Sequence, residues 1–379
     1  MKTLWHRFIS FWERHQRTIG LGGLVLGFSF DLWLAKRPDS VADNILLLFY
    51  LAFAAIIIIV LNIRAVRRKM ETETPAEPLA LLLVLQFCFG GLANNLLILY
   101  GKSGTLAASL LFVGILLAFA LGNEFLKTRY SQLRFNVATY YFLLLTYCII
   151  AVPTFVLHRI GVKVFLASSA LSLVVIAVFL FFLYRFVFRR TEKKQIYEVV
   201  GIVLGICVMF NGLYFLHIIP PVPLSLKEIG IYHALATLPK DIHVQSGDIY
   251  SVTYEKPEWY AFWRDTSSIF TLPNNTAASG KQSAYCFSAV FAPGSLGTPV
   301  VHRWEKYNEG AKKWETKSVV SFPINGGREG GYRGYSLEES LTPGAWRCDV
   351  ETTRGELIGR ISFDVTQSAV APTLSTTTL

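Results

Sequence analysis

Long runs of hydrophobic residues, separated by short polar stretches, fill the first 220 residues of the chain. Seven of these runs approach the length of about 20 residues that a helix needs to cross the hydrocarbon core of a membrane. They lie at residues 18–35, 45–62, 79–99, 105–122, 138–157, 164–187 and 198–218. The pattern predicts an α-helical polytopic membrane domain over residues 18–220, with about seven transmembrane helices.

The pattern changes after the proline-rich connector at residues 219–223, where the prolines end the last helix. Apolar and polar residues then alternate in short segments, which is typical of β-strands. The predicted strands lie at residues 248–254, 285–292, 299–306, 316–323, 345–352 and 357–365, with an earlier one near 229–235. Short antiparallel strands without a long helix predict a C-terminal all-β domain over residues 221–366, an immunoglobulin-like sandwich. Residues 367–379, rich in Ser and Thr, are predicted to form a disordered tail.

Composition supports lipid as the solvent of the first half, because 53% of the 379 residues are hydrophobic and only 16% are charged. The net charge of +10 is confined to that half. Residues 1–223 carry 21 Lys and Arg against 10 Asp and Glu, whereas residues 224–379 carry 15 against 16. The second half has no basic surplus to neutralise phosphates, so nucleic acid is not a predicted partner.

The basic residues also predict the orientation in the membrane, because Lys and Arg are retained in cytoplasmic loops. Sixteen of them flank the spans on one side and five on the other, in strict alternation. This places the N-terminus in the cytoplasm and the β domain outside. Residues 1–17, with Trp5 and Trp12 beside Arg7 and Arg14, predict an interfacial amphipathic leader. The leader acts either as a simple anchor or as a docking helix for a cytoplasmic partner.

Polar residues inside the predicted spans are the usual pointers to function in a membrane domain. Four of them lie towards the predicted outer ends of spans one, three and seven: Asp31, Asn94, Asn95 and His217. They form a polar pocket if these spans are neighbours. The alternative is that they hydrogen-bond between helices or reach the interface.

Two cysteines of the β domain suggest a cross-link. Cys286 and Cys348 are 62 residues apart, and Trp346 lies two residues before the second, as in the disulfide and core tryptophan of immunoglobulin domains. One observation argues against the bond: the more apolar face of strand 285–292 is the one opposite Cys286. A disulfide and two unpaired thiols both remain open.

The segment from Asn325 to Tyr335 holds five glycines, two arginines and two tyrosines. Glycine lets backbone N–H groups approach a ligand, while Arg and Tyr supply charge and a stacking surface for an anionic or sugar-like group. The candidate binding residues are Arg328, Tyr332, Arg333 and Tyr335, together with His302 and Trp304. The alternative is structural: the glycines serve an irregular strand and the arginines stack on the tyrosines.

Sequence motifs for catalysis are missing from the β half: it contains no GxSxG, no HExxH and no CxxC, and its histidines are isolated. We therefore expect no enzyme activity, no cofactor and no metal site. The leading hypothesis is a partner-binding membrane protein. The alternative is a small-molecule or lipid-handling protein, for transport or flipping, with the β domain as a cap.

Several short motifs carry a resemblance to a known family. They are Pro221 to His233, Val290 to Pro293, His302 to Trp304, Gly326 to Arg328, Gly331 to Tyr335 and Pro343 to Arg347. Residues 221–366 resemble a bacterial domain family of unknown function that often forms the C-terminus of inner-membrane proteins, and residues 1–220 are similar to a membrane region of equally unknown role. The resemblance implies a Gram-negative inner membrane and a periplasmic domain. It provides no catalytic residues. The partner expected for a membrane-tethered β domain without catalytic groups is another envelope protein or an anionic glycan.

Overall fold

The structure is a computed structural model that describes residues 39–71, 79–101, 110–118, 132–186, 193–238, 249–256, 269–273, 283–294, 296–328 and 330–379. The described residues divide into two compact units. The helical unit comprises the described residues up to residue 156 together with residues 162–219. The β unit comprises residues 157–161 together with the described residues from 220 onward. Each unit is described by itself.

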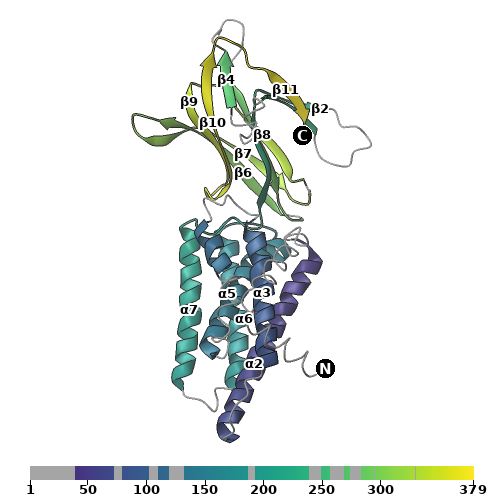
Figure 1. Ribbon diagram of the computed structural model, residues 1–379, viewed down its shortest axis with the longest axis vertical. Helices are drawn as coiled ribbons and strands as arrows, with labels where there is room; N and C mark the ends of the chain where they lie inside the picture. The colour runs from purple at the N-terminus through teal and green to yellow at the C-terminus, as the bar shows by residue number, and fades with distance from the viewer. Residues whose placement is uncertain are drawn as a thin grey trace, which may run out of the picture. The chain divides into compact units, whose positions relative to one another are not determined.

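The helical unit contains five described helices that are long and apolar enough to cross a membrane. They are α2 (Val41–Glu71), α3 (Leu79–Gly101), α5 (Leu133–Ala151), α6 (Val162–Phe186) and α7 (Lys193–Phe215) (Figure 1). Five of the seven predicted spans therefore correspond to such helices. The predicted first span, like the leader 1–17, lies outside the described residues, and residues 110–118 of the predicted fourth span are helical.

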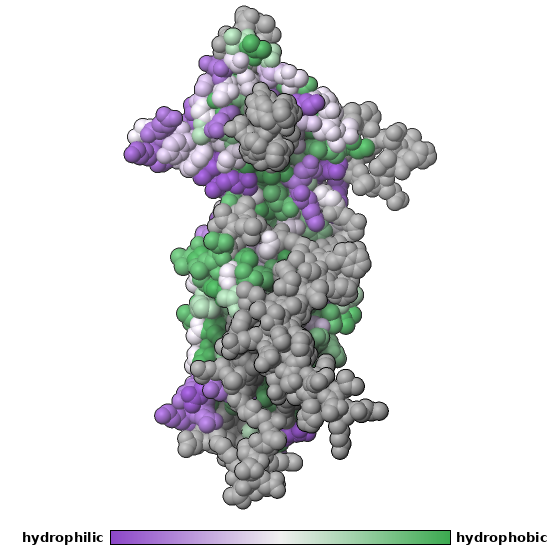
Figure 2. All heavy atoms as spheres, viewed as in Figure 1, coloured by the Kyte–Doolittle hydropathy of each residue, from purple (hydrophilic) through white to green (hydrophobic). Residues whose placement is uncertain are grey.

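Helix α5 is the centre of the helical unit and packs against α2, α3, α6 and α7. Nearly every residue from Asn136 to Ile150 is buried, which explains why this helix is apolar on all sides. A cluster of aromatic rings fills the space beside it, with Phe112 against Tyr100 and Phe210. The Tyr100 hydroxyl donates a hydrogen bond of 3.0 Å to the Thr146 carbonyl. Figure 2 shows mainly hydrophobic residues on the described outer surface of the helices, as expected for contact with lipid.

The β unit is built from eleven described strands. They are β1 (Ser225–Tyr232), β2 (Ala234–Leu238), β3 (Ile249–Glu255), β4 (Ile269–Pro273), β5 (Ala284–Phe291), β6 (Gly297–Asn308), β7 (Lys313–Asn325), β8 (Tyr332–Glu338), β9 (Gly344–Thr352), β10 (Leu357–Ser368) and β11 (Leu374–Thr378). They form three sheets in the orders β1-β5-β8, β4-β10-β9-β6-β7 and β11-β3-β2. All pairs are antiparallel except β4 with β10.

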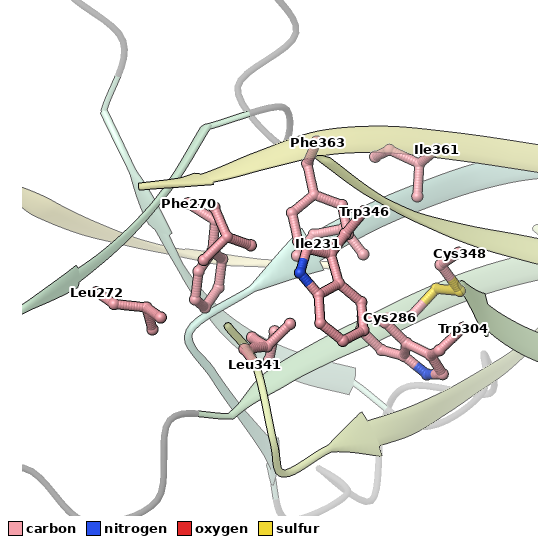
Figure 3. Packing of buried hydrophobic residues seen from close by; sticks show 12 residues of the cluster. Ile231, Phe270, Leu272, Cys286, Trp304, Leu341, Trp346, Cys348, Ile361 and Phe363 are labelled. Carbon is pink, nitrogen blue, oxygen red and sulfur yellow. A yellow bond between two sulfur atoms is a disulfide. The ribbon is translucent and has the colours of Figure 1, made fainter. Parts of the chain in front are cut away.

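The first two sheets pack face to face as a sandwich around a core that includes Trp304, Trp346 and Phe363 (Figure 3). The third sheet covers the other face of β5, where Phe287 and Ala289 meet Tyr250 and Val252 of β3. Strand β5 is therefore buried on both faces. This removes the argument against a disulfide at Cys286. The more apolar face of β5 packs against the third sheet, and Cys286, on the opposite face, points into the sandwich.

Two segments differ from the sequence prediction. The tail predicted to be disordered forms β11, which pairs with β3 from Leu374 opposite Glu255 to Thr378 opposite Ser251. Thr is β-branched and favours strands, and β3 offers an unpaired edge, so composition alone was misleading here. The glycine-rich segment is not wholly a loop either, because residues 332–338 form strand β8 along β5.

Candidate functional site

A buried polar group joins the two sheets of the sandwich. His302 on β6 has its Nε2 2.7 Å from the Ser288 hydroxyl and its Nδ1 2.9 Å from the Ser336 hydroxyl. The Trp304 indole N–H donates to the same Ser336 oxygen at 2.9 Å. His302 and Trp304, two of the predicted binding residues, are fully buried. They are thus core residues, out of reach of a partner on the domain surface.

Burial also determines the charge of His302. Removal from water disfavours the imidazolium ion, and it lowers the pKa of His302 from 6.5 to about 4. The side chain is consequently neutral at pH 7, with one ring nitrogen donating and the other accepting. A single neutral histidine between two serine hydroxyls, closed off from water, is a structural network.

The structure joins Cys286 on β5 to Cys348 on β9 in a disulfide that links the two sheets (Figure 3). The Sγ atoms and a ring nitrogen of His302 all lie within 4.8 Å of one another, which is close enough for metal ligands. Because the two sulfurs are bonded to each other, however, neither offers the thiolate that a metal requires. The described free cysteines are Cys88, Cys148 and Cys207, all buried in helices.

The glycine-rich segment is explained largely by packing. A Cβ atom on Gly326 would lie 2.3 Å from the Pro293 carbonyl oxygen, and one on Gly334 would lie 2.3 Å from the Phe322 ring. Gly327 and Gly331 have φ angles of 93° and 84°, which only glycine adopts readily. Arg328 lies over the Tyr332 ring at 5.1 Å. Arg328 and Tyr332 form the stacked pair that the structural alternative expects, and Arg328 itself is exposed.

The other two candidates of this segment, Arg333 and Tyr335, lie on the opposite face of β8. Tyr335 is 43% exposed, and its ring lies 5.9 Å from Tyr250 and 6.0 Å from Tyr285. The Arg333 guanidinium donates a hydrogen bond of 3.1 Å to the Leu379 carbonyl. We call these four residues, Tyr250, Tyr285, Arg333 and Tyr335, the tyrosine surface. This surface combines the exposed Tyr335 ring, which two neighbouring rings contact, with the half-buried Arg333 guanidinium.

A ladder of ion pairs covers the outer face of the five-stranded sheet, and sequence reasoning missed it. Its pairs are Arg303 with Glu351 at 3.1 Å, Arg347 with Glu305 at 2.5 Å and Arg360 with Asp349 at 2.5 Å. Burial raises the pKa of Glu351, and the hydrogen bond from Arg303 opposes this effect. The alternate charges at positions 303, 305, 347, 349 and 351 were the available signal. Each charge of the ladder has a partner within it, so we interpret the ladder as structural.

His233 is not isolated, contrary to the sequence interpretation. Its Nε2 lies 2.7 Å from Glu255 Oε1, and its ring stacks on Phe270 with centroids 3.9 Å apart. Glu255 also accepts hydrogen bonds from the backbone N–H and the hydroxyl of Thr271. Burial would raise the pKa of Glu255, but these hydrogen bonds outweigh it and lower the pKa. The group ties β3 to β4.

Three residues of the predicted polar pocket of the membrane domain are among the described ones, and Asp31 lies outside the described residues. The Asn95 amide donates to the Gly91 carbonyl of its own helix at 2.9 Å, and neighbouring Asn94 is half-buried on the same helix. His217 is exposed just beyond the end of α7.

Comparisons with known proteins give the β unit a family likeness. Residues 297–365 match a family described as a protein of unknown function, DUF2914. These residues carry strands β6 to β9 and most of β10, hence Cys348, the whole glycine-rich segment and the ladder. No curated protein matches the chain. The C-terminal unit is therefore a β domain similar to a family of unknown function.

Three solved structures show weak similarity. An immunoglobulin-like protein from Pseudomonas aeruginosa is 14% identical, with a TM-score of 0.18 over 36% of this chain and 96% of that one. A beta-glucosidase from Listeria innocua, in complex with isofagomine, is 9% identical, with a TM-score of 0.19 over 38% and 17%. A DNA-bound alkylpurine DNA glycosylase from Pseudomonas fluorescens is 9% identical, with a TM-score of 0.20 over 87% and 99%. These scores are low, and none of the three contributes to the argument on function.

Proposed function

We propose that this protein is a multi-pass inner-membrane protein that displays its β domain in the periplasm and uses it, without catalysis, to bind another envelope protein. About seven spans would carry the domain, with the N-terminus in the cytoplasm. The five described apolar helices and the alternating basic residues support this placement.

The observation that carries the binding proposal is the tyrosine surface. Tyr335 keeps 43% of its area exposed although ring contacts fix it on two sides. Tyr and Arg are enriched among the residues that dominate protein interfaces, and a ring that is already fixed loses little entropy on binding. An anionic glycan is the other ligand class that an arginine beside an exposed aromatic ring would suit.

Replacing Tyr335 by Ser and Arg333 by Gln in the full chain tests this proposal. Loss of an interface anchor costs about 2 kcal/mol, or roughly 30-fold in affinity. Purification from crosslinked cells should recover a discrete partner with the wild type and lose it with the double variant. The matched control is Val319→Ser, which removes another exposed side chain, 52% exposed, from strand β7.

Two outcomes would count against the proposal as stated. If the double variant recovers the same partners as wild type, the tyrosine surface is not the binding site. If the captured material resists protease and is removed by glycan-degrading enzymes, the partner is an anionic glycan.

A second candidate function, a lipid-handling membrane protein with the β domain as a cap, is favoured by a different observation. An apolar cavity of about 630 Å³ opens between α2, α5 and α6. Its volume falls within the range of about 300–1,000 Å³ that is usual for small-molecule sites.

A further inference from the structure

The cavity in the helical unit has the form of a slot. One wall is the face of α2 from Val41 to Ala52, the opposite wall runs along α5 from Tyr140 to Val156, and Leu171 and Val175 of α6 complete it. The α5 residues recur every three or four positions, so they form one continuous stripe. We call this cavity the apolar slot.

The dimensions of the apolar slot fit one extended chain. The 16 residue steps from Tyr140 to Val156 span about 24 Å at the helical rise. Dividing about 630 Å³ by that length gives a mean cross-section of about 26 Å². Carbon atoms pack at about 3.5–4.0 Å, so such a slot takes a single hydrocarbon chain more readily than a ring system.

A local irregularity of the backbone forms part of the wall. Residues Val152–Leu157 continue α5 as a π-helix, and Pro153 within it has no N–H with which to continue the α-helical pattern. Single π-turns inside longer helices are frequent at functional sites. Here the π-helix contributes Val152, Phe155 and Val156 to the slot, so it helps set the slot's width at that end.

Three side chains with hydrogen-bonding groups, those of Asn44, Tyr140 and Tyr147, interrupt the apolar lining. Tyr147 is 5% exposed, and its hydroxyl makes no hydrogen bond among the described residues. An unpaired hydroxyl is costly in a hydrocarbon medium, where water is not available. Asn44 is 6% exposed in the first turn of α2, where its amide donates to the Ser40 carbonyl at 2.8 Å. The slot therefore has a polar end where α2 begins and two tyrosine hydroxyls, those of Tyr140 and Tyr147, along its α5 wall.

We propose that the apolar slot binds one hydrocarbon chain of a membrane lipid, with its polar head at the end where α2 begins and an acceptor such as an ester carbonyl on the Tyr147 hydroxyl. Surrounding lipid is as apolar as the slot, so burial of the chain supplies no driving force by itself. Selectivity comes from the shape of the slot and from the hydrogen bond to Tyr147. The inference rests on the second candidate function and is independent of partner binding at the tyrosine surface.

Native mass spectrometry of the full-length protein, released from detergent, tests the proposal. Wild type should retain one lipid per chain through detergent exchange. Ala151→Phe places a ring in the slot and should reduce lipid occupancy at least tenfold. The matched control is Ala177→Phe, an exposed position of α6 that does not line the slot, which should retain lipid as wild type does.

Tyr147→Phe gives a second readout that leaves the packing in place. It should lower lipid occupancy severalfold at equal thermal stability. The proposal is overturned if wild type emerges free of lipid under conditions that keep it folded, or if both Ala151→Phe and Tyr147→Phe retain lipid as Ala177→Phe does. Retention of lipid without movement of fluorescent lipid across reconstituted vesicles would leave the binding site standing and reject lipid transport.

Discussion

At the scale of single residues, His302 shows how the surroundings decide the role of a side chain. In the sequence, His302 is a polar residue two positions before Trp304, and this made His302 a reasonable candidate for contact with a ligand. In the fold it lies at the centre of the sandwich, between Ser288 and Ser336, with an edge-on contact to Phe322. Its burial turns a titratable group into a permanent neutral bridge between sheets.

The lowered pKa of His302 predicts loss of stability in acid. The folded-state pKa of about 4 lies below the ordinary value of 6.5, so below pH 6.5 the unfolded chain binds a proton that the folded chain does not. The His302 contribution is complete above pH 6.5 and is lost as the pH falls towards 4. Denaturant unfolding of the full chain in detergent, followed by tryptophan fluorescence, should show a decrease of roughly 3 kcal/mol from this group.

The control for this prediction is His302→Gln, which keeps hydrogen-bonding atoms and removes the titration. Its unfolding free energy should decline less steeply between pH 7 and pH 4 than that of wild type. Equal slopes for the two proteins would show that His302 does not titrate as its burial requires.

Gly326 provides a second prediction at this scale. A methyl group there would collide with three backbone carbonyl oxygens, those of Ala292, Pro293 and Gly294. Gly326→Ala should therefore lower the free energy of unfolding by about 1–3 kcal/mol. Gly330→Ala is the matched control in the same segment, because a Cβ atom there meets nothing within 4 Å. A neutral Gly326→Ala variant would reopen the idea that the glycines serve a ligand.

At the scale of elements, strand β5 is the structural centre of the β unit. Its neighbours are β1 and β8, its inner face meets the five-stranded sheet, and its outer face meets β3. The disulfide from Cys286 to Cys348 fixes this central strand to β9. Removing the cross-link should therefore destabilise the unit as a whole.

Replacing both Cys286 and Cys348 by Ala should lower the unfolding free energy by about 4 kcal/mol, because the bond closes a loop of 62 residues. The same unfolding assay with and without a dithiol reductant provides the check. Reductant should lower the stability of wild type and leave the double variant unchanged. If wild type is insensitive to a reductant that demonstrably opens the bond, the disulfide contributes little to this fold.

How well sequence predicted each element depended on the strength of its pattern. Apolar runs predicted the helices, and regular alternation located β3, β5, β6, β7, β9 and β10 within a few residues. Strand β8 was missed because Gly331 and Gly334 obscure its alternation, although Gly334 sits where the Phe322 ring leaves no room for a side chain. Strand β11 was missed because its Thr residues signal a strand only when the free edge of β3 is known.

The candidate site was only partly predictable for a related reason. Sequence selected Arg333 and Tyr335, but it could not separate them from Arg328 and Tyr332. The alternation of β8 separates Tyr332 from Arg333 and Tyr335, since residues 333 and 335 share one face and residue 332 lies on the other, and Arg328 precedes the strand. Burial of His302 depends on strands distant in sequence.

At the scale of the whole molecule, the two units differ in the polarity of their exposed side chains. The described helices expose large apolar side chains such as Phe87 and Phe181, whereas the β unit exposes few. In an intact cell we expect the β unit to be accessible from the periplasm and the cytoplasmic ends of the helices to be inaccessible from that side. A single cysteine in place of the exposed Val319 should react with a membrane-impermeant thiol reagent from the periplasm, while one in place of Arg64, near the predicted cytoplasmic end of α2, should react only after the inner membrane is opened. The reverse pattern would invert the topology.

The most direct test of the central claim is photo-crosslinking from position 335 in intact cells. A photoreactive residue in place of Tyr335 should yield one discrete adduct that contains an envelope protein, whereas the same residue in place of Val319 should not. The expected result is an adduct at position 335 and none at position 319. Equal crosslinking from both positions, or none from 335 while other positions of the chain react, would contradict partner binding at the tyrosine surface.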